Sequence, residues 1–141
     1  MKDLKLAIIY YSSTGTNYQL SQWAEEAAKE LGVGEVRLRK VKELAPKEAI
    51  EANEDWKKHM EKTKDVKEAG MEDLEWADAF IFSAPTRYGN LPSQLKQFLD
   101  STGGLWFSGK LANKVVSGMT SASNVHGGQE GTLLSLYKTM H

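Results

Sequence analysis

The sequence predicts an α/β fold, with a doubly wound parallel sheet in a single domain that spans residues 1–141. Short apolar runs typical of strands alternate along the chain with segments whose apolar residues recur at helical spacing. A polar loop follows three of the four predicted strands. Right-handed crossovers between parallel strands place helices on both faces of such a sheet. The length and the 40% of apolar residues are ordinary for one globular domain.

The first unit is a strand, a tight polar loop and a helix. The apolar run Leu6–Tyr11 predicts a buried strand, and Ser12–Asn17 is a loop of hydroxyl, amide and glycine residues. A helix follows, because apolar residues from Leu20 to Leu31 share one face. Backbone N–H groups at the start of a helix lie at the positive end of its dipole. The loop therefore predicts an anion site.

Two interpretations of this loop are open. One of its hydroxyls would serve merely as a helix cap. A cap needs a single such residue, however, and the loop has four hydroxyls, an Asn and a Gly. This surplus of hydrogen-bonding groups favours a phosphate site.

The segment from residue 35 to residue 75 is densely charged. It holds ten Lys or Arg and twelve Asp or Glu residues with intermixed signs, which is typical of a solvated helix surface. A half-exposed edge strand at 35–39 opens the segment. A charged helical insertion near 45–70 follows, and its thin apolar stripe, which includes Trp56, is expected over the sheet edge or in a subunit contact. His59 is expected at the surface of this insertion.

The third strand is expected to be central in the sheet. A short helix, Met71–Trp76, leads into Asp78–Ala84, which is apolar enough to be buried on both faces. The polar loop Pro85–Asn90 comes next, and a helix with an apolar face extends from Leu91 to Leu99. A glycine-rich loop with two large aromatic residues then spans Thr102–Gly109.

The fourth strand, Lys114–Thr120, leads to a third polar loop, Ser121–Glu130, and to a last helix with apolar residues from Leu133 to Met140. Charge is sparse in this half of the chain, since residues 79–141 hold five Lys or Arg and two Asp or Glu. A run of small uncharged donors is typical of a lined pocket, although buried core and turns would give the same composition.

The three polar loops are expected to meet in space. Ligands of open parallel sheets bind at the carboxyl ends of the strands, where the strand order reverses. Because each loop follows a strand, all three would gather at that edge. The sequence therefore predicts a ligand site built from three separate segments.

Composition argues against several other classes of protein. The net charge of −1 gives no long-range attraction to nucleic acid or to an anionic membrane. The chain has no cysteine, so disulfides, thiolate nucleophiles and cysteine metal sites are excluded, and no acidic cluster predicts a bound metal. No apolar run approaches the roughly 20 residues that span a bilayer. No signal peptide is expected before the first strand.

Comparison with known motifs narrows the kind of phosphate ligand. A dinucleotide site needs G-x-G-x-x-G after the first strand, and Gly15 stands alone there. The run Gly104–Lys110 matches G-x-x-x-x-G-K, but Leu111 replaces the magnesium-binding Ser or Thr and the run follows a helix. A phosphoacceptor domain needs an Asp at the end of the third strand, where Ala84 and Pro85 stand. A mononucleotide with a flat ring remains.

Four segments give the chain a resemblance to the WrbA family. They are Tyr-Tyr-Ser-Ser-Thr-Gly-Thr-Asn at 10–17, Pro-Thr-Arg-Tyr-Gly-Asn at 85–90, Gly-Gly-Leu-Trp at 103–106 and Gly-Gly-Gln-Glu at 127–130. The second and fourth are specific to the family, and flavodoxins generally share the first. The resemblance covers essentially the whole chain. It implies a flavodoxin-like fold with strand order 2-1-3-4 and FMN as the cofactor, which flavodoxin binds at this switch point.

The resemblance also implies which residues bind FMN. The first loop would hold the phosphate, while the second and third would flank the isoalloxazine ring. The expected cofactor-binding residues are Ser12, Ser13, Thr14, Gly15, Thr16, Asn17, Pro85, Thr86, Arg87, Tyr88, Gly89, Asn90, Ser121, Ser123, Asn124 and Gly127. No catalytic residue is assigned, but Arg87 and Trp106 are expected to shape the cleft shared by flavin and quinone. No metal is expected.

The activity implied by the resemblance is that of an FMN-dependent NAD(P)H:quinone oxidoreductase, with two-electron hydride transfer through flavin N5 to a quinone. The reductant would be NADH or NADPH. The family implies a cytoplasmic homo-oligomer, either a dimer or a homotetramer, with no nucleic acid or membrane as partner. Two alternatives are a flavodoxin-type electron carrier, which the near-neutral charge disfavours, and a chain that binds FMN weakly without turnover.

The family pattern continues past the last predicted helix with a fifth strand and a final helix. These two elements are expected to be missing from the 141 residues. The fourth strand is therefore expected to form an open edge of the sheet.

Overall fold

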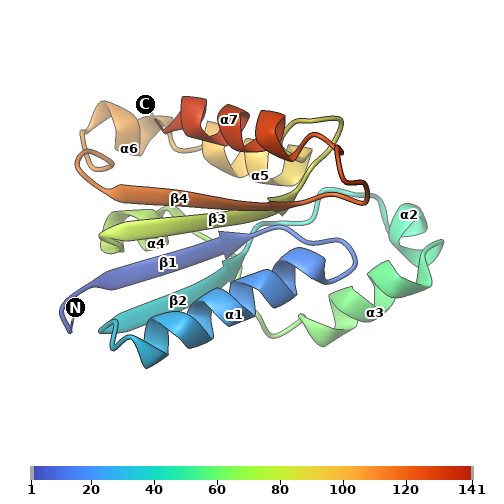
Figure 1. Ribbon diagram of the computed structural model, residues 1–141, viewed down its shortest axis with the longest axis horizontal. Coiled ribbons are helices and arrows are strands. Elements are labelled where there is room, and N and C mark those ends of the chain that lie inside the picture. The colour runs from blue at the N-terminus through green and yellow to red at the C-terminus, as the bar shows by residue number, and fades with distance from the viewer. Residues whose placement is uncertain (1, 141) are drawn as a thin grey trace.

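The computed structural model describes residues 2–140. Strands and helices alternate as the sequence predicts, and their bounds are β1 Lys5–Tyr10, α1 Thr16–Glu30, β2 Glu35–Lys40, α2 Lys47–Glu51, α3 Glu54–Lys62, α4 Met71–Trp76, β3 Ala79–Pro85, α5 Ser93–Asp100, α6 Gly103–Phe107, β4 Val115–Ser121 and α7 Gln129–Thr139. The strands are all parallel and lie in the order β2-β1-β3-β4 (Figure 1). The predicted α/β class and strand order are confirmed.

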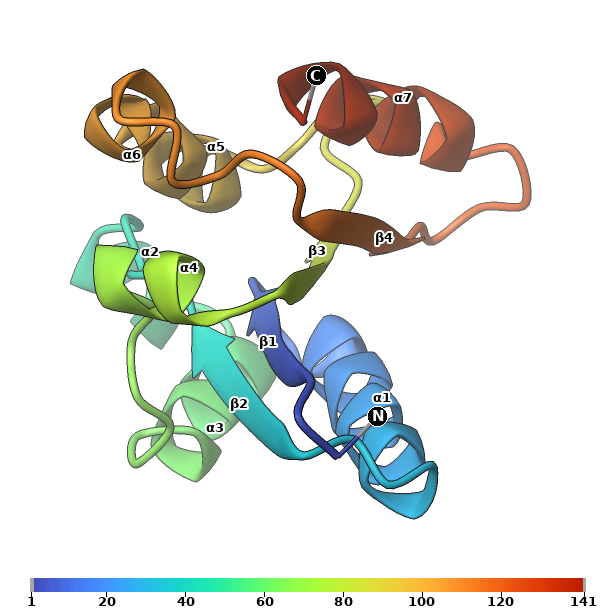
Figure 2. The same ribbon diagram turned by 90° about the vertical axis from the view of Figure 1, so that its left-hand side faces the viewer.

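Each face of the sheet builds its own core, because successive side chains of a strand point to opposite faces. Leu6 and Ile8 of β1 share a core cluster with Ala28 of α1. Phe80 and Phe82 of β3 belong to a larger cluster with residues of α4, α5 and α7. Figure 2 shows α1 on one side of the sheet and α4, α5 and α7 on the other. The sheet is thus covered on both faces, as a doubly wound fold requires.

Strand β4 forms one edge of the sheet. It pairs with β3 along its whole length, from Val115 opposite Ala79 to Ser121 opposite Pro85. Its other side has no strand partner within residues 2–140, which agrees with the expected open edge. Val115 at its start is 69% exposed. None of the helices in the described part of the chain is long and apolar enough to cross a membrane.

Two segments differ from the sequence prediction in detail. The charged insertion forms two helices, since Asn53 interrupts it and caps α3 by accepting the N–H groups of Asp55 and Trp56. Figure 1 shows α2 and α3 beyond the end of the sheet at which β1 runs into α1. The glycine-rich stretch Thr102–Gly109 was expected to be a loop, but it contains the short helix α6. One turn of helix forms there despite its two glycines.

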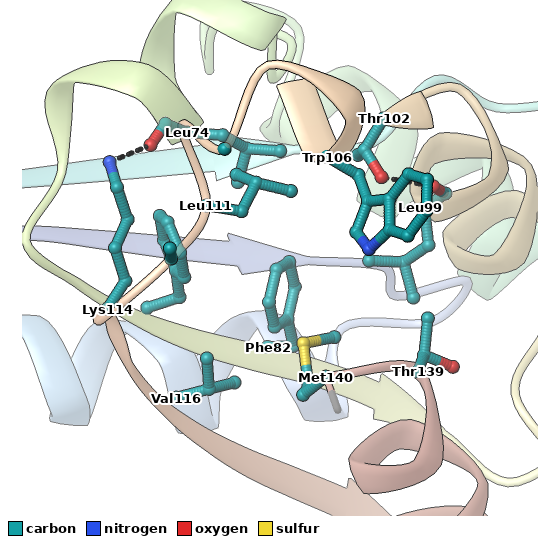
Figure 3. Close-up of a pocket in the computed structure, with 13 residues that line it drawn as sticks. Leu74, Phe82, Leu99, Thr102, Trp106, Leu111, Lys114, Val116, Thr139 and Met140 are labelled. Atoms are coloured by element: carbon teal, nitrogen blue, oxygen red, sulfur yellow. Dashed lines mark hydrogen bonds between the residues drawn. The ribbon is translucent and has the colours of Figure 1, made fainter. Parts of the chain in front are cut away.

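Lys114 connects the start of β4 to the end of α4. Its Nζ donates to the backbone oxygens of Leu74, Glu75 and Ala77, at 2.6, 2.9 and 2.6 Å. Figure 3 shows the bond to Leu74. A cation at a helix C-terminus satisfies carbonyl groups that have no partner inside the helix and opposes the negative end of its dipole. Burial lowers the pKa of the Lys114 ammonium, but its acceptors are all carbonyl oxygens. The contact therefore acts as a helix cap supplied from a distant strand.

Replacing Lys114 with Met tests this cap. The variant keeps most of the aliphatic stem and loses three charge-assisted hydrogen bonds. The free energy of unfolding should fall by about 1–2 kcal/mol, as measured by urea denaturation. The control is Lys110→Met, which removes only a surface ion pair with Glu75 and should change the stability by less than about 0.5 kcal/mol. Equal losses in the two variants would contradict the cap.

Candidate functional site

The loop between β1 and α1 leaves the start of the helix without a side-chain cap. Gly15 immediately precedes α1 with a φ of 111°, a left-handed conformation that glycine adopts readily. Its N–H donates to Ser12 Oγ at 3.0 Å, which closes the loop. No side chain caps α1, and its first turn has no acidic residue. The structure therefore contradicts the simple capping interpretation and leaves the first-turn N–H groups available to an anion.

Asn17, in the first turn of α1, joins the ends of three strands from a buried position. Its Nδ2 donates to Ser83 Oγ at 3.1 Å, and its Oδ1 accepts from Ser121 Oγ at 2.6 Å. Its backbone oxygen accepts from Ser21 Oγ at 2.7 Å. Asn17 is only 1% exposed. Its side chain is thus used within the protein, where it fixes the loop after β1 against β3 and β4.

The loop after β3 is a tight turn. Arg87 and Asn90 exchange both backbone hydrogen bonds, at 2.9 and 3.0 Å. The two residues between them, Tyr88 and Gly89, have left-handed φ values of 54° and 73°. The turn leaves the Tyr88 side chain fully exposed. Tyr88 is therefore presented to the outside of the site and does not line its floor.

This turn is fixed against the loop after β4 by a close backbone contact. Thr86 Oγ1 and Thr132 Oγ1 lie 2.7 Å apart, and Thr86 N–H donates to the Ser121 oxygen at 2.9 Å. A Cβ atom added to Gly128 would lie 2.6 Å from the Cα of Gly89, closer than side-chain carbons approach. The second and third loops therefore meet along a seam at which Gly128 has no room for a side chain. Gly89 would have room, since its Cβ would lie 4.0 Å from the Cα of Gly128, but its left-handed φ of 73° favours glycine.

Arg87 links the second loop to the first. Its Nη2 donates to Ser13 Oγ at 3.3 Å, and its Nη1 donates to the Thr86 oxygen at 3.1 Å. No carboxylate pairs with it within residues 2–140. An arginine without a carboxylate partner keeps its charge available to an anionic ligand. Arg87 is therefore not held in a surface ion pair among the described residues.

The three loops enclose a hollow of about 240 Å³ at the carboxyl ends of the strands. Its lining residues are Ser12, Ser13, Thr14, Thr16, Asn17, Pro85, Thr86, Arg87, Ser121, Ala122 and Ser123. All except Ala122 were expected from the sequence. Arg87 is the only ionisable side chain among them, so the lining is neutral or positive. Such a lining suits a phosphate ester and a polar uncharged ring system.

Comparison with known proteins agrees with this geometry. The sequence model of a family described as NADPH-dependent FMN reductase matches residues 4–138. The chain belongs to this family. It is 57% identical over 139 residues to a protein named NAD(P)H dehydrogenase (quinone) from Deinococcus radiodurans, a match that covers 98% of this chain and 69% of that protein. A protein of the same name from Aromatoleum aromaticum is 42% identical over 137 residues, with 97% and 66% covered.

This member of the FMN reductase family also resembles solved flavodoxin structures. The flavodoxin, WrbA-like protein from Agrobacterium tumefaciens superposes with a TM-score of 0.71 at 24% identity, which covers 97% of this chain and 71% of that one. A flavodoxin from the domain Archaea gives 0.50 at 14% identity, with 98% and 100% covered. These likenesses show the flavodoxin-like fold, and the family resemblance inferred from the four sequence segments is confirmed. The chain spans about two thirds of the length of its named relatives.

Six of the expected cofactor-binding residues do not line the hollow of this reductase-family chain, namely Gly15, Tyr88, Gly89, Asn90, Asn124 and Gly127. Gly15 and Gly89 shape their loops through left-handed backbone. Gly127 lies where a Cβ would be 2.6 Å from Ala122 Cβ, so it permits the third loop to fold back on itself. The backbone oxygen of Asn124 accepts from Gln129 Nε2 at 3.1 Å. Gly15, Gly89 and Gly127 therefore shape the loops that carry the lining.

Trp106 is not brought to the hollow within one copy of the chain. It lies on α6 and lines a separate apolar hollow of about 340 Å³, together with Phe80 and Lys114 from the beginnings of β3 and β4 (Figure 3). The reason is topological, because α5 carries the chain from the site back to the opposite end of the sheet. The expectation that Trp106 shapes the cleft is therefore not met by this chain alone.

The structure corrects the predicted position of one residue that lies beside the site, His59. His59 was expected at the surface of the charged insertion, yet it is 6% exposed and lies against the loop that precedes α1. It is three residues beyond Trp56 on the same helix, so helical spacing places it on the face that Trp56 marks. The apolar stripe would have predicted a buried His59 if a polar residue had been counted as part of it.

Replacing Ser83 with Ala tests the role of Asn17 as a tie between the loops. The substitution leaves the Asn17 amide N–H without an acceptor in a buried position, so the free energy of unfolding should fall by about 1–3 kcal/mol. Chemical denaturation measures the change. Ser117→Ala, at an exposed position of β4, is the matched control and should lie within about 0.5 kcal/mol of the unaltered chain. If the two variants are equally stable, the tie does not contribute as described.

Proposed function

We propose that this chain binds FMN in the hollow between its three loops and uses it as an NAD(P)H:quinone oxidoreductase. The observation that carries the proposal is the uncapped start of α1 beside a neutral, hydroxyl-rich lining. The family match and the names of the relatives support the same activity. Because the chain spans only about two thirds of those relatives, the activity of the whole protein is part of the proposal.

The residues present fit FMN at each end of the hollow. The first-turn N–H groups of α1, with the hydroxyls of Thr14 and Thr16, would hold the phosphate, since helix N-termini favour anions. Pro85, Thr86 and Ser123 would bound the ring. None of the lining residues is acidic, so nothing in the lining repels the phosphate dianion.

When bound, FMN supplies two-electron hydride chemistry at its N5 atom, and the protein contributes position and electrostatics. Arg87 holds a guanidinium group at the junction of the first two loops, where it would favour negative charge on a ring beside it. Asn17 and Thr86 keep the three loops in register. A fixed hollow orients the ligand without a further rearrangement of the chain.

Purified chain reconstituted with FMN tests the activity. NADPH oxidation by added benzoquinone should proceed faster than with the same concentration of free FMN, and the flavin should remain with the protein on gel filtration. Turnover no faster than that of free FMN would contradict the proposed enzymatic activity and favour the alternative of a flavodoxin-type electron carrier.

The affinity of the Thr14→Asp variant for FMN tests whether the phosphate binds at this loop. A carboxylate beside the phosphate should weaken FMN binding by about tenfold to a hundredfold. Ala27→Glu adds the same charge at an exposed position of α1 and should leave binding unchanged. Equal affinities in the two variants would place the phosphate elsewhere.

We also propose that copies of the chain assemble, as a dimer or a homotetramer. Trp106 and Phe107 on α6 are 73% and 87% exposed, and adjacent large apolar side chains on a surface are typical of interfaces. The cytoplasmic location expected from the sequence stays a prediction.

Light scattering tests the assembly through α6. The unaltered chain should have a mass that is a multiple of 15.7 kDa, and Phe107→Ser should lower it. Leu31→Ser removes an exposed apolar side chain at the end of α1 and should leave the mass as it is. A monomeric unaltered chain would overturn the proposal.

A further inference from the structure

Helix α3 places a buried histidine, His59, behind the Ser12–Asn17 loop that is proposed to hold the FMN phosphate. The Nδ1 atom of His59 lies 3.5 Å from the point that a Cβ of Gly15 would occupy. Its ring centroid is 5.6 Å from that of Tyr18, which in turn is 5.3 Å from that of Tyr10. A row of three rings thus extends from β1 through the first turn of α1 to α3. His59 is the member of this row that approaches the loop from α3.

His59 also separates two hollows on the far side of the loop. One, of about 210 Å³, is bounded by Thr14 and Gly15 on one side and by Lys58 and Lys62 on the other. The other, of about 50 Å³, lies beneath Ser12. Because His59 lines both hollows, its ring lies between the loop and the rest of α3.

Contacts at both ends of α3 keep the position of His59 fixed. Trp56 Nε1 donates to Glu43 Oε2 at 3.3 Å. Thr63 Oγ1 donates to the His59 backbone oxygen at 2.8 Å, and Lys40 Nζ donates to the Thr63 oxygen at 2.7 Å. A side chain on a helix held in this way is a rigid support for a loop.

The ring acts as an uncharged group near neutral pH. Burial lowers the pKa of His59, and the ammonium groups of Lys62 and Lys40 lower it further, while hydrogen bonding with the Ser12 backbone and the Glu43 carboxylate act in the opposite direction. The ionisable groups that line the two hollows with it are Tyr10, Tyr11, Lys40, Glu43 and Glu68 on one side and Tyr18, Asp55, Lys58 and Lys62 on the other. Its contribution at pH 7 is therefore shape and polarity, without charge.

We propose that His59 is a positioning residue that holds the Gly15 peptide in place for the phosphate end of FMN. It thereby sets the preference of the site for FMN over riboflavin, which lacks the phosphate. The inference rests on the proposed function. Gly15 adopts a left-handed φ, and its N–H is held within the loop by Ser12 Oγ at 3.0 Å, so His59 adds a support from behind to that contact. Support from α3 keeps the N–H groups aimed at a single point.

Binding of the two flavins to His59→Ala tests this role. Quenching of flavin fluorescence should show a dissociation constant for FMN that is about tenfold higher, with that for riboflavin within about twofold of the unaltered chain. His59→Gln keeps a polar group of similar reach and should weaken FMN binding by only about threefold. Lys57→Ala, exposed on the same helix, is the control and should bind both flavins normally. If His59→Ala does not fold, His59→Gln serves as the test, because it should weaken the binding of FMN and leave that of riboflavin unchanged.

A titration followed by NMR gives a second readout that needs no turnover. The pKa of His59 should rise when FMN binds, because a phosphate dianion across Gly15 stabilises the imidazolium form. Riboflavin should leave that pKa unchanged.

Two outcomes would overturn the inference. One is an equal loss of FMN and riboflavin affinity in His59→Ala, which would indicate a purely structural role. The other is no loss for either ligand. An unaltered chain that fails to bind FMN would instead contradict the proposed function, and the inference would fall with it.

Discussion

The geometry of the site depends on one buried amide. The side-chain amide of Asn17 donates to the Ser83 hydroxyl at the end of β3 and accepts from the Ser121 hydroxyl at the end of β4. A buried amide that loses a partner is costly, so the three strand ends have one favourable arrangement relative to one another. The Thr86–Thr132 and Thr86–Ser121 contacts join the second and third loops as well, and Asn17 ties the first loop to both strand ends. Together these contacts make the three loops the walls of one hollow.

Electrostatics then decides what the hollow accepts. Its lining carries hydroxyls, backbone groups and a single guanidinium, while the dense charge of the chain lies in the 35–75 segment. The start of α1 adds a partial positive charge that no side chain neutralises. The site therefore attracts one anionic group at a defined point and leaves the rest of the ligand to fit by shape. That division matches a cofactor with one phosphate and a flat polar ring.

Much of this arrangement could be predicted from the sequence, because it follows from local rules. Apolar strands followed by polar loops predict both the parallel sheet and the edge at which Thr14, Thr86 and Ser123 meet. What escaped prediction depends on contacts between distant segments. His59 is buried by α1, more than forty positions earlier, and Trp106 is carried away from the site by the direction of α5. Helical spacing indicates the face of α3 on which His59 lies, but not which distant segment covers that face.

The glycine seam between the second and third loops limits how this site can change. A Cβ atom on Gly128 would lie 2.6 Å from the Cα of Gly89, so the third loop cannot gain a side chain there without displacing the second. The two loops are therefore one structural unit in this chain, and a larger residue in place of Gly128 would push them apart. The side chains from Ser123 to His126 in the third loop are exposed instead, so they can change without disturbing the seam. A designer who wished to alter substrate choice would begin there and leave the seam intact.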